Sequence, residues 1–267
     1  MNSLENVRPT GSDGCQAKAR KGVMPLSIVE LRESMSDHQI LVEMSNMLVY
    51  GMYPQVRQAE TVEEQAEILR QLVDEHLARE QVKNPGALRE LLVVLARSTG
   101  QLVSTLSLSK KVGISTRMVD KYLELLKNSG VLLNLRGFRR DLKTEIIGKS
   151  KWYFCDLGIR NMLLRDLAPP QLRSDIHVVW ESFLVAERLK TLKSMRAKPA
   201  TYFWQASHGQ AVDLVEDHRS VLRTYHFKWM PKIKRRAPVI FLNTYPDSTF
   251  DEVTPRICLD FITSKSK

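Results

Sequence analysis

Hydrophobic positions in the first half of the chain recur at helical spacing. Between residues 61 and 80 the apolar side chains fall on one face and the acidic ones on another, which predicts an amphipathic helix. Helices are also predicted over 24–33, over 40–50, and from the Asn84-Pro85 start signal to Gly100. Residues 1–22 lack any such period, and we expect a disordered lead-in there. The pattern therefore predicts a helical segment over residues 23–100.

The pattern changes between residues 101 and 160. A short helix ends at Gly113, and Ser115 is an N-cap for a helix over 116–128 whose apolar positions share one face. Extended segments follow over 131–135 and up to Ile147, separated by a basic turn, and an apolar strand is predicted over 152–155. This order is typical of a winged helix-turn-helix, in which the two extended segments form the wing.

The last part of the chain, residues 170–267, combines a helix with strands. A helical pattern runs from 174 to about 193, and strands are predicted over 201–205, 211–216 and 221–229. A helix followed by three strands is the skeleton of restriction-endonuclease-like domains. The predicted fold class is α+β: the helical segment, the winged helix-turn-helix, and a restriction-endonuclease-like α/β domain.

Composition is that of an ordinary soluble globular protein, with 43% hydrophobic and 26% charged residues. No apolar stretch is long enough to span a membrane, and the N-terminus lacks the order of a signal peptide, so we expect a cytoplasmic protein with no membrane partner. The three cysteines are too far apart for a zinc motif, and their odd number argues against a disulfide framework.

Positive charge is concentrated in the predicted winged helix. The formal net charge is +10, and residues 104–160 hold 12 Lys and Arg against 5 Asp and Glu. Such a concentration favours duplex DNA as a partner. A winged helix can also pack against a partner chain, and Asp120 and Glu124 on the presumed recognition helix would repel phosphates, so both readings stay open. The expected phosphate contacts are Lys110, Lys111, Arg117, Lys121, Arg136, Arg139 and Arg140.

Four residues of the C-terminal part occupy the positions of a metal-dependent nuclease site. Glu181 lies on the predicted helix, Asp213 on the second strand, and His226 and Lys228 on the third. In such a site carboxylates hold Mg²⁺ and the lysine polarises the attacking water. An imidazole is a poor Mg²⁺ ligand, although Mn²⁺ tolerates a nitrogen, so any metal held by Glu181 and Asp213 would be weakly bound.

No phosphate-binding loop is expected in this chain. Gly148-Lys149-Ser150 has the last letters of that motif, but Lys143 stands where the first glycine is needed, and a strand is predicted after it instead of a helix. We therefore expect no nucleotide cofactor.

The chain resembles the bacterial and archaeal ATP-binding proteins that join an AAA-type ATPase domain to a winged helix and a C-terminal restriction-endonuclease-like domain. The matching stretches cover nearly the whole chain after residue 22. They are Met24–Leu31, Leu48–Val56, Leu95–Leu102, Val112–Thr116, Trp152–Gly158, Trp180–Phe183, Tyr202–Trp204, Gly209–Leu214, Tyr225–Trp229 and Thr244–Pro246.

Set against the family that it resembles, this sequence differs in two ways. The family's phosphate-binding loop and Mg²⁺-binding aspartate lie upstream of the first stretch, so the chain looks like the C-terminal portion of such a protein. The family usually has acidic residues at the positions of Ala211 and His226, so the nuclease-like site looks eroded. We therefore expect a non-catalytic, truncated member that binds DNA, a partner protein or a separate ATPase chain and needs no cofactor. The alternative is a nuclease that uses Mg²⁺ or Mn²⁺ through Glu181, Asp213, His226 and Lys228.

Overall fold

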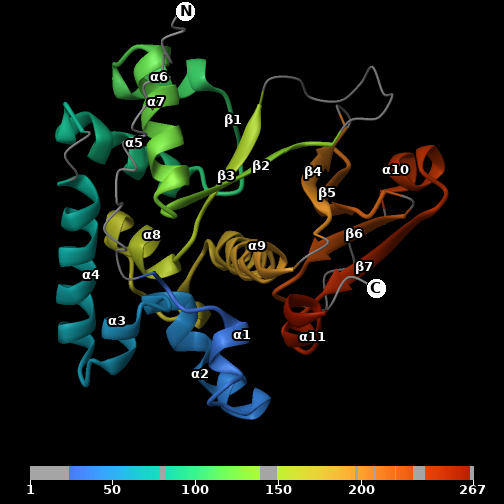
Figure 1. Ribbon diagram of the computed structural model, residues 1–267, viewed down its shortest axis with the longest axis horizontal. Helices are drawn as coiled ribbons and strands as arrows, with labels where there is room; N and C mark the ends of the chain where they lie inside the picture. The colour runs from blue at the N-terminus through green and yellow to red at the C-terminus, as the bar shows by residue number, and fades with distance from the viewer. Residues whose placement is uncertain are drawn as a thin grey trace, which may run out of the picture.

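The computed structural model describes residues 24–78, 82–138, 149–195, 198–206, 209–219, 221–230 and 238–264. Arg139 and Arg140, two of the predicted phosphate contacts, lie outside these residues. The fold class is α+β, as predicted. Most of the helices come from the first half of the chain, and the strands within the described ranges form one seven-stranded mixed sheet (Figure 1).

The first part of the described chain is helical. It contains α1 (Ile28–Leu31), α2 (Asp37–Tyr50), α3 (Pro54–Gln58), α4 (Val62–Leu77) and α5 (Pro85–Arg97). Serine, threonine or asparagine side chains accept N–H groups in the first turn of α1, α2, α4 and α5. These caps satisfy donors that have no partner within the helix, which explains why each helix begins where it does.

The next elements have the order and pairing of a winged helix-turn-helix. They are β1 (Leu102–Val103), α6 (Thr105–Val112), α7 (Thr116–Asn128), β2 (Leu132–Gly137) and β3 (Ser150–Phe154), and β3 pairs antiparallel with both β1 and β2. Gly113 ends α6 at φ 72°, and the Ser115 side chain accepts the Met118 N–H to start α7. The tight turn between the helices thus follows from a left-handed glycine and an N-cap serine.

One long helix, several shorter helices and four strands make up the rest of the described chain. After α8 (Leu157–Leu164) and the short 3₁₀ helix η1 (Pro170–Leu172) come α9 (Ile176–Ser194), β4 (Ala200–Gln205), β5 (Ala211–Asp217), β6 (Leu222–Phe227), α10 (Val239–Thr244), β7 (Ser248–Val253) and α11 (Cys258–Thr263). Strands β4, β5 and β6 pair antiparallel in order, and β7 pairs parallel to β6.

The sheet runs without a break from the winged helix into the C-terminal part. Strand β2 pairs parallel with β4, with Arg136 opposite Tyr202 and Gly137 opposite Phe203, and the strand order is β1-β3-β2-β4-β5-β6-β7. One apolar core joins α3, α4 and α5 to α7, β3 and α8, and another joins α1 and α2 to α9 and the C-terminal strands. In the part of the chain that the structure describes, no helix combines the length and apolar character needed to cross a bilayer.

Candidate functional site

The winged helix carries a surface of unpaired cations, which we call the basic surface: Lys110 and Lys111 at the end of α6, Arg117 and Lys121 on α7, and Arg136 on β2. All five side chains are exposed. Within the described ranges none of them pairs with a carboxylate. The structure therefore leaves each of these charges available to an anionic partner.

The position of this surface follows from the apolar pattern of α7. Val119, Tyr122, Leu123 and Leu126 are buried against the helical segment and the wing strands. Because an α-helix has 3.6 residues per turn, this buried face turns Arg117 and Lys121 to the opposite side. The exposed orientation of the two cations is thus set by residues that contribute only packing.

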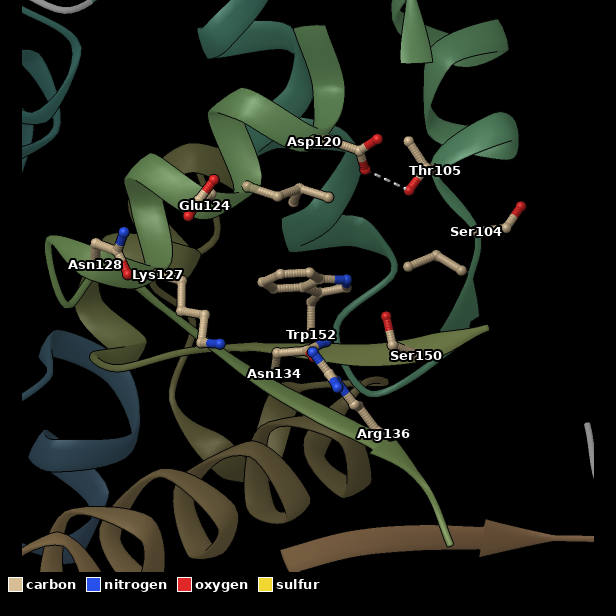
Figure 2. A pocket seen from close by; sticks show the side chains of 12 residues that line it. Ser104, Thr105, Asp120, Glu124, Lys127, Asn128, Asn134, Arg136, Ser150 and Trp152 are labelled. Carbon is tan, nitrogen blue, oxygen red and sulfur yellow. Dashed lines mark hydrogen bonds between the residues drawn. The ribbon is translucent and has the colours of Figure 1, made fainter. Parts of the chain in front are cut away.

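A polar cleft of about 320 Å³ lies beside the basic surface, between α7 and strands β2 and β3. Figure 2 shows Asp120 and Glu124 on the helix side, with the Trp152 ring between them and the strands that carry Asn134 and Arg136. Asp120 accepts a hydrogen bond from the Thr105 hydroxyl at 2.9 Å. The two acidic residues of α7 therefore line this cleft, whereas Arg117 and Lys121 do not.

In the C-terminal part the structure brings two of the predicted nuclease residues together. Asp213 on β5 and His226 on β6 are both buried, and Oδ2 of Asp213 lies 2.6 Å from Nδ1 of His226. The same oxygen accepts the Phe227 N–H at 2.9 Å. Burial acts to raise the pKa of Asp213, but His226, the charge of Lys151 and the Phe227 N–H together outweigh burial and hold that pKa below its usual value.

The other two predicted residues have different partners. Glu181 on α9 accepts hydrogen bonds through Oε1 from the Lys151 ammonium at 3.0 Å and from the Tyr153 hydroxyl at 2.6 Å. Lys228, directly after β6, pairs with Glu252 on β7. Burial, and then the charge and hydrogen bond of Glu181, raise the pKa of Tyr153 well above its usual value, so its hydroxyl stays protonated.

The arrangement does not fit a Mg²⁺ ion. Mg²⁺ requires oxygen ligands in near-octahedral geometry. Here one oxygen of Asp213 is taken by His226 and one of Glu181 by Lys151 and Tyr153. Among the described residues, no group of three or more His, Cys, Asp or Glu side chains has a geometry that holds a metal ion.

Sequence reasoning missed several of the residues just described. Lys151, Tyr153 and Trp152 lie on one apolar strand, and Glu252 lies on a strand that the sequence did not predict. A polar lysine in an apolar strand was the available signal for Lys151, since a buried lysine needs a partner. Ser150, the last residue of the rejected phosphate-loop motif, opens β3, so a strand follows this residue as expected.

Residues 42–169 of the chain match the model of a family described as a domain of unknown function (DUF8612). The match begins within α2 and ends just before η1, so it covers most of the helical segment and all of the winged helix. Neither the comparison with curated proteins nor that with solved structures found a match.

Proposed function

We propose that this chain binds duplex DNA through the basic surface of its winged helix. The observation that carries the proposal is the set of five exposed cations on α6, α7 and β2, none of which pairs with a carboxylate within the described residues. In a winged helix the second helix of the motif approaches a groove while neighbouring cations contact phosphates. Each phosphate neutralised by Lys or Arg releases counterions, which supplies affinity without reading the base sequence.

The position of the acidic residues supports this proposal. Asp120 and Glu124 were the sequence-level objection to DNA, because phosphates repel carboxylates. Both line the cleft against Trp152, and neither Arg117 nor Lys121 does. A backbone that contacts Arg117 and Lys121 therefore meets the basic surface on a part of α7 that lies outside the cleft.

The wider assignment is also a proposal. We infer that the chain is a non-catalytic relative of the AAA-type ATP-binding proteins, acts in the cytoplasm, and uses the winged helix for DNA or for a partner chain. Support comes from the ten motifs in the family's order and from the winged-helix pairing of β1, β2 and β3. DNA is favoured over a partner chain because the basic surface is charged and lacks exposed apolar side chains, apart from Leu106.

Fluorescence anisotropy with a labelled duplex tests the proposal. The variant Arg117→Glu/Lys121→Glu should bind at least about tenfold more weakly than the wild type, because two phosphate contacts become repulsive. The control Lys193→Glu/Arg256→Glu makes the same charge change at exposed positions outside the winged helix and should keep the wild-type affinity. Equal losses in both variants would mean that net charge alone drives binding, and no loss in either would favour the packing role.

A second candidate function is a nuclease of the restriction-endonuclease type. It is favoured by the order of α9, β4, β5 and β6 and by the contact between Asp213 and His226 on neighbouring strands. It is weakened by the partners that already occupy Glu181, Asp213 and Lys228.

A further inference from the structure

We propose that the cleft between α7 and strands β2 and β3 binds a small zwitterion, with a guanidinium group at the acidic side and a carboxylate at the basic side. The cleft has about 320 Å³ of space. Ligand cavities in proteins occupy about 300 to 1,000 Å³, so the guest must be of amino-acid size. The cleft shares Arg136 with the basic surface, whereas Arg117 and Lys121, the DNA contacts tested above, do not line it.

The acidic side is formed by Asp120 and Glu124, one turn apart on α7. The Thr105 hydroxyl donates to Oδ1 of Asp120 and holds that side chain in place. Neither carboxylate pairs with a cation within the described residues. Two carboxylates at this spacing are suited to a guanidinium, whose planar donors match carboxylate oxygens.

Trp152 supplies an aromatic surface to the same guest. The ring lines the cleft and is only half-buried. A guanidinium can stack on an indole ring, because the negative face of the ring attracts the cation. An aromatic ring next to two unpaired carboxylates selects a flat cation over a compact, strongly hydrated one.

The basic side is formed by Lys127 and Arg136. Lys127 lies on α7 and Arg136 on β2, and both line the cleft (Figure 2). No ion pair within 4 Å joins them to Asp120 or Glu124, so the two kinds of charge share one cleft without neutralising each other. A guest with charge of one sign only would be attracted at one side and repelled at the other, whereas a zwitterion satisfies both.

Isothermal titration calorimetry with L-arginine tests this proposal. Arginine should bind saturably with a Kd below about 1 mM, a modest affinity expected for a ligand of this size. Citrulline, which lacks the guanidinium charge, and agmatine, which lacks the carboxylate, should each bind at least about fivefold more weakly, because each loses one of the two charged ends.

Variants assign the binding to this cleft. Asp120→Asn/Glu124→Gln should lose arginine binding, and Arg136→Gln should bind arginine no better than the wild type binds agmatine. The control Glu75→Gln/Glu90→Gln removes two exposed carboxylates on α4 and α5 and should bind like the wild type. Circular dichroism of each variant identifies any loss that is due to unfolding, and Arg136→Gln, at an exposed position, keeps the test decisive if the acidic double variant unfolds.

Three results would overturn the proposal. These are an absence of saturable arginine binding by the wild type, wild-type affinity in Asp120→Asn/Glu124→Gln, or equal affinities for arginine, citrulline and agmatine. None of these results bears on the DNA affinity of Arg117→Glu/Lys121→Glu, so the two proposals fail separately.

Discussion

The carboxylate of Asp156 accepts the backbone N–H of Met52 at 2.6 Å, which ties the start of α8 to the end of α2. Its other oxygen accepts the Ile159 N–H and so caps α8. Gly51 lies so close that a Cβ there would come within 2.1 Å of Asp156 Oδ1, and a Cβ on Gly158 would meet the Tyr50 carbonyl oxygen at the same distance. Two stretches that sequence similarity picked out separately thus pack directly against each other.

This close approach predicts that Gly51→Ala is more destabilising than Gly113→Ala. Both glycines have positive φ, but a Cβ at Gly113 would meet nothing within 4 Å. Gly113→Ala should cost about 1 to 2 kcal/mol of unfolding free energy for the left-handed backbone alone. Gly51 lies at φ 78° and ψ −159°, a region almost confined to glycine, and a Cβ there also clashes with Asp156, so Gly51→Ala should cost at least about 1 kcal/mol more. Urea unfolding of both variants measures the difference.

A double-mutant cycle identifies the cause. Asp156→Ala removes the clash together with the cap, so its cost and that of Gly51→Ala should be clearly non-additive. Additive costs would show that the backbone conformation of Gly51, and not Asp156, determines the penalty.

The helical segment and the winged helix could be predicted because their elements are amphipathic. Helix α7 has apolar residues at positions 119, 122, 123 and 126, and all four are buried as the spacing indicates. Helix α8 was not predicted, because burial on nearly all sides removes the periodicity: Leu157, Ile159, Arg160 and Asn161 are buried in succession around the helix. Such a helix can be recognised only from its tertiary contacts.

In the candidate sites, too, only the features that follow from local periodicity could be predicted from the sequence. Exposure of the basic surface follows from the period of α6 and α7 and was predictable. The contacts of Glu181 with Lys151 and Tyr153 were not, because they depend on the packing of α9 across β3. The pairing of β2 with β4 was also missed, since parallel pairing of distant strands leaves no local pattern.

Stability should fall in acid partly through Asp213. Its pKa in the folded protein lies below the value in the unfolded chain, because His226, Lys151 and the Phe227 N–H together outweigh the effect of burial. The carboxylate therefore stabilises the fold fully above the unfolded pKa of about 3.9, and this contribution is lost as the pH falls through the folded pKa. Between about pH 5 and pH 3 the wild type should lose more unfolding free energy than Asp213→Asn.

Urea unfolding across this pH range measures the effect. Asp217→Asn, at the end of the same strand, removes the same charge and is the matched control. An Asp213→Asn protein with an unchanged pH dependence would mean that the pKa of Asp213 is the same in the folded and unfolded states, which contradicts the prediction.

DNA binding should depend strongly on salt. If about four to six cations of the winged helix meet phosphates, log K should fall against log salt with a slope of about −4 to −5. Replacing Lys110 and Lys111 with glutamine should make this slope shallower by about 2, because each contact contributes about 0.9. Anisotropy titrations between about 50 and 200 mM salt give the slopes. A slope near zero would contradict the phosphate-contact proposal even if the duplex binds.

The last prediction concerns the nuclease-like residues: the wild-type chain should not cleave DNA in Mg²⁺. Asp213 is held by His226, and Glu181 by Lys151 and Tyr153, so an oxygen of each carboxylate already has a protein partner. His226 also offers a nitrogen, which Mg²⁺ disfavours. A plasmid-nicking assay tests this, and cleavage by the wild type that Asp213→Asn abolishes would establish the nuclease function.

The informative variant is His226→Glu, which places a second carboxylate beside Asp213 and two residues before Lys228. Calorimetric binding of Mn²⁺ by His226→Glu but not by the wild type would identify a metal centre lost through one substitution, whereas binding by neither would argue against the likeness of these strands to a restriction-endonuclease site.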